Sequence, residues 1–113
     1  MPTSYRSAYA KFRCGVAPIR VETGRYENLR LLERTCFCCP DSIENEEHVL
    51  LFCPLYDDIR DSCFNTLNID GFDNFSSQDK LSVILGGVNN IRLCAKTCRD
   101  ILDRRRRFLY TCR

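Results

Sequence analysis

The sequence contains only one histidine, and it has no apolar run long enough to cross a membrane. A membrane-spanning helix needs about 18 or more predominantly apolar residues. The N-terminus also lacks the apolar core of a secretory signal. A Ser/His/Asp triad would have to use the one histidine, and no Gly-x4-Gly-Lys phosphate-binding loop is present. We therefore expect an intracellular protein, in the nucleus or the cytoplasm, that makes no membrane contact and is not an enzyme.

The charge balance and the cysteine content further restrict the class of protein to which this chain can belong. Among 113 residues, 17 basic side chains nearly balance 15 acidic ones, so net charge alone does not indicate a nucleic-acid partner. Nine cysteines in a chain of this length would suit a secreted disulfide scaffold, but the number is odd and no export signal accompanies it. Metal binding in a reducing compartment is the better interpretation, and a disulfide-stapled secreted protein is the disfavoured alternative.

Four of these residues have the order and spacing of a zinc site, Cys36-x2-Cys39-x8-His48-x4-Cys53. A two-residue gap lets both thiolates of a tight turn face one ion, and three sulfurs with one imidazole suit tetrahedral Zn²⁺. Four protein ligands leave no open position for a catalytic water, so the predicted site is structural. Cys38 is the alternative to Cys39, although a one-residue gap from Cys36 is sterically poorer for chelation.

The second half of this predicted site contains a geometric difficulty. On a regular α-helix, His48 and Cys53 would point about 140° apart. Pro54 follows directly and disfavours the α conformation for the residue before it. We therefore expect Cys53 to leave the helical path where it can turn toward the metal.

The rest of the chain predicts helices and no strand. An all-α fold is expected, a small helical domain organised around one Cys-Cys-His-Cys zinc site. The predicted helices are residues 3–14, a segment capped by Asn45, residues 54–67, residues 76–85 and residues 89–110. Residues 16–35 are expected to form an irregular connector with a helical turn near 28–34. Residues 68–76 are expected to form a loop. In one compact domain, residues 1–35 supply the first helix and connector, 36–67 the zinc knuckle and its helices, and 68–113 a C-terminal helical segment.

Motifs around the cysteines resemble a known family. The stretch Glu22-Thr-Gly-Arg-Tyr26, the Cys-x2-Cys knuckle and His48-x4-Cys53-Pro54 are similar to the zinc-binding region that follows the polymerase domain in non-LTR retrotransposon reverse transcriptases. The similarity covers roughly residues 8 to 65. It implies Cys36, Cys39, His48 and Cys53 as zinc ligands, RNA or DNA as the partner, and a reverse transcriptase polymerase domain as a second partner.

The polymerase itself is not carried over by this resemblance. Reverse transcriptases keep metal-binding aspartates in a Tyr-x-Asp-Asp hairpin, whereas Tyr56-Asp57-Asp58 lacks the intervening residue and lies on a predicted helix. There the two aspartates would complement the positive N-terminal end of the helix. We expect a fragment without polymerase activity; a truncated element, a gene-model fragment and a domesticated module are equally compatible with the sequence.

A basic run closes the last predicted helix, namely Arg104, Arg105, Arg106 and Arg107. These arginines are the candidate phosphate contacts, although cations near a helix C-terminus are favourable in any protein. A second basic cluster, Lys11, Arg13, Arg20 and Arg25, is interleaved with aromatic residues that would either stack on bases or belong to the core. Cys14, Cys63, Cys94 and Cys98 are interpreted as small buried residues.

Two functions remain open. The first is a zinc-stabilised nucleic-acid-binding module from a retrotransposon reverse transcriptase. The second is a structural or protein-interaction domain that packs against a polymerase and does not touch nucleic acid. Replacing the four arginines by glutamate would separate the two, because only the first function depends on their charge.

Overall fold

The computed structural model describes residues 1–111, and within this range the regular secondary structure consists of helices. The only β-type pairing there is an isolated antiparallel bridge between Thr35 and Ile43. No helix within the described range is both long and apolar enough to span a membrane. In chain order the helical segments are α1 (Thr3–Arg13), α2 (Arg20–Tyr26), η1 (Leu31–Glu33), η2 (His48–Phe52), η3 (Pro54–Tyr56), α3 (Asp57–Leu67), η4 (Phe72–Asn74), α4 (Ser77–Leu85) and α5 (Ile91–Thr111).

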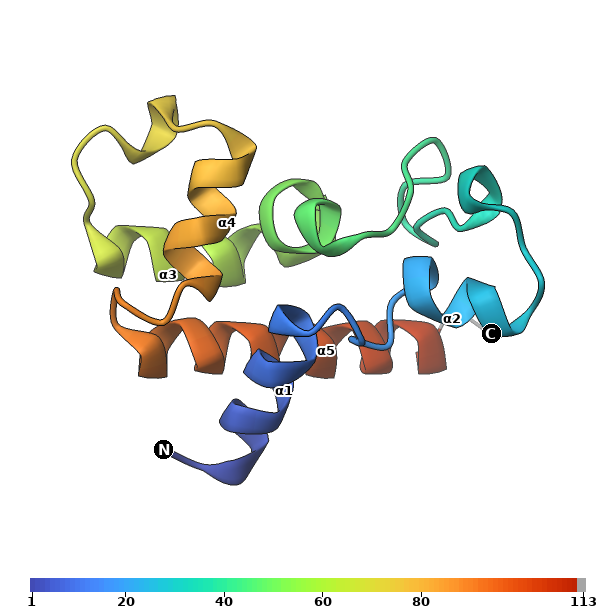
Figure 1. The fold of residues 1–113 in the computed structure, drawn as a ribbon, viewed down its shortest axis with the longest axis horizontal. Helices are drawn as coiled ribbons and strands as arrows, with labels where there is room; N and C mark the ends of the chain where they lie inside the picture. The colour runs from blue at the N-terminus through green and yellow to red at the C-terminus, as the bar shows by residue number, and fades with distance from the viewer. Residues whose placement is uncertain (112–113) are drawn as a thin grey trace.

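The long helix α5 is the element on which the others pack. Figure 1 shows it along the length of the molecule, with α1 crossing it and α3 lying above one half. Its buried face carries Cys94, Cys98, Ile101 and Leu102 at intervals of three and four residues, as the sequence predicts. These side chains meet the buried residues of α1 and η2 in one hydrophobic cluster.

Two helix starts follow the predicted chemistry. Ser76 caps α4 by accepting a hydrogen bond from the backbone N–H of Asp79 at 3.2 Å. Pro54 opens a 3₁₀ turn that continues directly into α3. Both outcomes confirm the expected boundaries, because an N-capping hydroxyl and a proline at the first helical position satisfy or remove N–H groups that have no intrahelical acceptor.

The connector at 16–35 contains a helix that the sequence did not predict. Gly24 lies within α2 and is buried, and a Cβ atom there would meet Arg34 Cγ at 2.5 Å. Arg34 crosses the helix at this point and donates hydrogen bonds to the carbonyls of Val21 and Leu29. Gly24 is thus the residue of α2 that allows this arginine to pack against the helix. The predicted turn near 28–34 is present as η1.

Candidate metal centre

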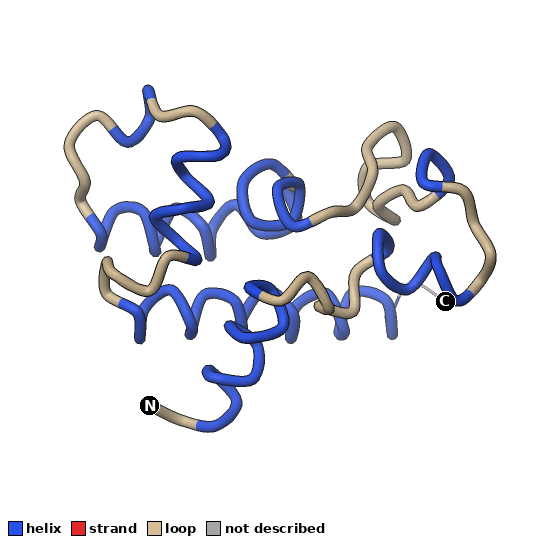
Figure 2. The backbone as a smooth tube through the Cα atoms, in the orientation of Figure 1, coloured by secondary structure: helices blue, strands red, loops and turns tan. Residues whose placement is uncertain are grey.

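The first two cysteines of the predicted site lie on a short turn held by backbone hydrogen bonds. The N–H of Cys36 donates to Ser42 O at 2.9 Å, and the N–H of Ser42 donates to Cys39 O at 3.0 Å. The bridge between Thr35 and Ile43 closes the base of this turn. Figure 2 shows that most of the chain between α2 and η2 is loop, so these few bonds are what fix the two thiols in position.

The other two ligand candidates are brought together by a single π-helical turn, η2. Asn45 caps the short helical stretch of Glu46 and Glu47 that leads into it, since its side-chain oxygen accepts the N–H of His48 at 2.9 Å. The N–H of Cys53 then donates to His48 O at 2.7 Å, closing an i→i+5 ring that places both residues on the same side. Cys53 itself is extended, with φ −63° and ψ 123°, as expected before Pro54. The sequence predicted only that Cys53 leaves the helical path before Pro54. The π winding is a second feature that brings Cys53 toward His48.

These four residues form a group whose geometry suits one metal ion. The Sγ atoms of Cys36, Cys39 and Cys53 and a ring nitrogen of His48 all lie within 4.8 Å of one another. The Sγ atoms of Cys36 and Cys53 are 3.9 Å apart. In a tetrahedral site with metal–sulfur bonds of about 2.3 Å, two sulfurs would be roughly 3.8 Å apart. Cys38 is exposed and is not a member of the group.

A buried ring nitrogen is the second observation that fits a metal here. Nε2 of His48 is buried and has no hydrogen-bond partner among residues 1–111. An unpartnered buried polar atom costs about 1–3 kcal/mol, and coordination to a metal ion would remove that cost. The donor set of three thiols and one imidazole therefore fits a metal ion both by distance and by the unsatisfied nitrogen.

Burial shifts the pKa values of Cys39, His48 and Cys53 in the direction that favours their neutral forms. It raises the pKa of the Cys53 thiol well above its ordinary value, and it raises the pKa of Cys39, with a further contribution from the nearby Cys36. Burial lowers the pKa of His48, an effect that Glu44 opposes and Arg60 reinforces. A neutral imidazole offers its lone pair directly, whereas the thiols must release protons when a metal binds.

A buried arginine of the neighbouring helix α3 stabilises the π turn with hydrogen bonds. Arg60 of α3 donates to the carbonyls of Leu50 at 3.0 Å, Cys53 at 2.8 Å and Val49 at 3.3 Å, and it pairs with Asp57 at 2.6 Å. The first three acceptors belong to the turn that carries His48 and Cys53. Arg60 therefore binds carbonyls at the C-terminal end of the π turn, where the helix ends before Pro54; of these, Cys53 O also accepts the N–H of Tyr56.

A buried ion pair joins the metal segment, residues 36–53, to the C-terminal helix α5. Glu44 is 2% exposed and Arg105 is 8% exposed, and their closest N···O distance is 2.6 Å. Both carboxylate oxygens accept from this guanidinium. The same carboxylate also accepts the backbone N–H of Arg20 at 2.7 Å, at the start of α2. Three segments that are distant in sequence thus meet at Glu44.

The structure separates the four arginines that the sequence grouped as phosphate contacts. Arg105 continues the buried stripe of Cys98, Ile101 and Leu102, so it points inward. Arg104 donates to both carboxylate oxygens of Asp58 on α3 and to Leu55 O. Arg106 and Arg107 are exposed. Helical periodicity therefore turns Arg105 into the core and away from the other three arginines, which line one cleft beside α5.

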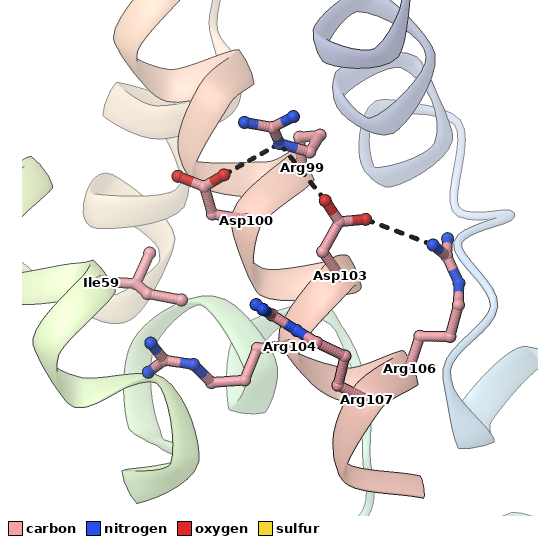
Figure 3. Close-up of a pocket in the computed structure, with 7 residues that line it drawn as sticks. All are labelled: Ile59, Arg99, Asp100, Asp103, Arg104, Arg106 and Arg107. Atoms are coloured by element: carbon pink, nitrogen blue, oxygen red, sulfur yellow. Dashed lines mark hydrogen bonds and ion pairs between the residues drawn. The ribbon is translucent and has the colours of Figure 1, made fainter. Parts of the chain in front are cut away.

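Two adjoining clefts lie along α5 and retain a net positive lining. The first, of ≈500 Å³, is lined by Ile59 of α3 and by Arg99, Asp100, Asp103, Arg104, Arg106 and Arg107 of α5. Figure 3 shows Asp103 between Arg99 and Arg106, with dashed lines to both. The second, of ≈240 Å³, lies between α1 and α5 and adds Lys11 to the same Arg99, Asp103 and Arg106. Sequence reasoning missed Arg99 and Lys11 as neighbours because they belong to different helices.

The aromatic residues beside the second basic cluster and the cysteines outside the metal group lie partly in the core and partly on the surface. Tyr9 and Phe12 are buried in the hydrophobic cluster, so they are not available to stack on bases. Cys63, Cys94 and Cys98 are buried as expected. Cys14 is exposed, and the prediction that it is a core residue is wrong because α1 ends at Arg13, before it. The eight cysteines in the described part of the chain form no disulfide.

No protein-family model, curated protein or solved structure matches this chain.

Proposed function

We propose that this chain is a zinc-stabilised nucleic-acid-binding module, related to the C-terminal zinc-binding region of non-LTR retrotransposon reverse transcriptases and without enzymatic activity of its own. The observation that carries the proposal is the Cys36, Cys39, His48 and Cys53 group, within 4.8 Å and with an unpartnered buried Nε2. Zn²⁺ is the ion that three thiolates and one imidazole at tetrahedral spacing favour. The ligand order is also the one on which the family resemblance rests.

The nucleic-acid part of the proposal rests on the surface of α5. Arg106 and Arg107 are exposed, and Arg99 and Lys11 line the adjoining clefts. Phosphate groups favour such guanidinium and ammonium side chains, and binding of this kind weakens as salt is added. Arg105 is buried against Glu44, and Arg104 pairs with Asp58 of another helix. Arg106 pairs only with Asp103 of its own helix and remains largely exposed, so Arg106 and Arg107 are the better candidates for direct contact.

Metal content and nucleic-acid titration test the two parts separately. Elemental analysis of the purified protein should find about one zinc per chain, and a strong chelator should reduce the helical signal in far-ultraviolet circular dichroism. Absence of zinc, with helicity unchanged by the chelator, would contradict the metal assignment.

Charge reversal tests the surface. Arg106→Glu/Arg107→Glu should abolish gel-shift binding of single-stranded and structured RNA or DNA, with zinc content unchanged. Arg30→Glu/Lys80→Glu is the matched control, because it makes the same change in net charge at exposed or half-buried positions on other elements. Equal loss in both variants would show that only net charge matters, and absence of binding by the wild-type chain at low salt would contradict the function.

A further inference from the structure

A groove beside the metal centre exposes apolar side chains. It has a volume of ≈460 Å³, and His48 and Ile43 lie in its wall. Two large apolar residues stand at its edge, Leu32 at 80% exposure and Phe52 at 55%. Leu32 comes from η1 and Phe52 from the π turn. The groove is therefore built by two short helical segments that lie before and after the turn of Cys36 and Cys39 in the chain.

The same groove is acidic. Asp41 and Glu47 line it, and neither has an ion-pair partner among residues 1–111. The stretch from Thr35 to Ile59 contains no lysine or arginine at all. The basic clefts lined by Arg99, Arg106 and Arg107 belong to α5 instead. The molecule therefore presents surfaces of opposite charge on different elements.

These two properties limit what can bind in the groove. Phosphate groups would be repelled by the two carboxylates, so nucleic acid is a poor occupant. A symmetric dimer through this face would bring Asp41 and Glu47 against their own copies, which is unfavourable for the same reason. Leu32 and Phe52 need an apolar side chain to cover them, and the carboxylates need cations.

We propose that this groove is a docking site for a polypeptide segment of another protein, one that carries a bulky apolar side chain flanked by lysine or arginine. The apolar side chain enters between Leu32 and Phe52, and the flanking cations pair with Asp41 and Glu47. This site is separate from the α5 surface and does not depend on nucleic-acid binding there. A protein partner and a nucleic acid would then occupy different faces of one small domain.

Fluorescence anisotropy with defined peptides tests the proposal on the full chain. The probe is a fluorescein-labelled Lys-Arg-Leu-Phe-Arg-Lys peptide, compared with one in which glutamate replaces every basic residue and one in which serine replaces leucine and phenylalanine. Only the first should bind. Leu32→Ser and Phe52→Ser should each weaken binding about tenfold, and Asp41→Asn/Glu47→Gln should weaken it by a similar factor, with a reduced salt dependence.

Matched changes elsewhere on the surface are the controls. Val88→Ser replaces an apolar residue that is 85% exposed, and Asp61→Asn/Asp73→Asn removes two acidic charges, all outside the groove. These variants should bind the peptide as the wild type does. Leu32 lies outside the π turn, so Leu32→Ser remains a valid test if Phe52→Ser disturbs the metal centre, which zinc content will report.

Three results would overturn the proposal. One is absence of peptide binding, or equal binding of the glutamate peptide. Another is peptide binding that the groove variants leave unchanged. The last is concentration-dependent dimerisation in sedimentation velocity that Leu32→Ser abolishes, which would make a second copy the occupant.

Discussion

Two adjacent cysteines, Cys38 and Cys39, lie in different environments because their distance from Cys36 differs by one residue. Cys38 and Cys39 are neighbours, yet Cys39 is half-buried and within reach of the other ligands, whereas Cys38 is exposed and outside the group. The two-residue gap from Cys36 places Cys39 at the end of the turn, where its carbonyl accepts the N–H of Ser42. The spacing rule used on the sequence therefore agrees with the geometry of this turn.

Serine substitutions should distinguish these two thiols. Cys39→Ser should lower bound zinc from about one ion per chain to a small fraction, because a neutral hydroxyl is a poor ligand for Zn²⁺. Cys38→Ser should leave zinc content unchanged. Elemental analysis of both purified variants, with Cys14→Ser as an exposed control, makes the comparison. Retention of zinc by Cys39→Ser together with its loss from Cys38→Ser would assign the ligand to Cys38.

The four residues of the candidate metal group could be predicted from the sequence, but the residues that support them could not. Thiols and an imidazole at fixed short spacings have few other uses, so their pattern is informative by itself. Glu44 and Arg60 are an ordinary acid and an ordinary base in the sequence. Their role depends on burial and on partners that are distant along the chain, such as Arg105, and no local pattern contains that information.

Among the elements, the π turn is the one whose geometry the site requires. A regular α-helix would direct His48 and Cys53 to different sides, while η2 brings them together through an i→i+5 hydrogen bond. This turn ends just before Pro54, and Arg60 donates to the carbonyls of Val49, Leu50 and Cys53 at its C-terminal end. The guanidinium is therefore part of what makes this unusual winding stable.

Replacing Arg60 should loosen the turn and the metal site together. Arg60→Met keeps much of the side-chain volume but removes every donor, so we expect a loss of about 2–4 kcal/mol in the free energy of unfolding. The measurement is urea unfolding, with a competition titration against a zinc chelator to report weaker metal binding. Arg92→Met, at an exposed position of α5, should change neither quantity. Unchanged zinc affinity in the Arg60 variant would show that the π turn holds without its guanidinium.

Helix prediction succeeded where periodicity or capping was strong and failed where tertiary packing decided. The stripe of α5 and the Ser76 cap of α4 are local signals, and both helices were predicted. α2 was missed because residues 16–35 show no clean helical period in the sequence. Its helical conformation depends on Arg34, which lies against Gly24 and bonds to carbonyls of the same region. A residue ten positions away thus determined a local structure.

At the scale of the whole molecule, α3 and α5 bury thiols against each other. Burial raises the pKa of Cys98 from 9.0 to about 12. Cys63 on the facing helix behaves oppositely, because a hydrogen bond with Cys94 lowers its pKa to about 7. Burial also raises the pKa of the Tyr56 hydroxyl, in the same direction as that of Cys98. Between about pH 9 and pH 12 the unfolded chain would lose the Cys98 proton while the folded chain keeps it, so stability should fall as the pH rises.

Removing this thiol should flatten the alkaline decline. In urea unfolding under reducing conditions at pH 8, 9 and 10, the free energy of unfolding of the wild type should fall above pH 9, by at most about 1.4 kcal/mol per pH unit from Cys98. Cys98→Ala should be less stable at pH 8, because a buried sulfur is lost, and should decline less steeply above pH 9. Cys14→Ala should follow the wild type. Parallel slopes for Cys98→Ala and wild type would show that this thiol ionises equally in the folded and unfolded states.

The ion pair between Glu44 and Arg105 makes the metal segment and the C-terminal helix depend on each other. Glu44→Gln would leave the buried Arg105 without its counter-charge, so we expect a loss of about 3–5 kcal/mol in the free energy of unfolding. Glu44→Gln/Arg105→Met should cost much less than the sum of the single variants, since no unpaired charge remains buried. The exposed pair of Arg30 and Glu33 provides the control, and its double variant should show no measurable coupling.

The zinc affinity of the same variants tests whether the ion pair also supports the candidate metal site. Because Glu44 also accepts the Arg20 N–H and follows the Cys36–Cys39 turn, its loss should disorder the segment that supplies two of the ligands. Zinc binding to a less stable fold has to supply the missing folding free energy, so the apparent affinity should fall in Glu44→Gln and recover in part in Glu44→Gln/Arg105→Met. Competition with a chromogenic chelator measures both. Equal zinc affinity in wild type and Glu44→Gln would mean that the metal segment folds independently of α5, and that the buried ion pair serves the helix packing alone.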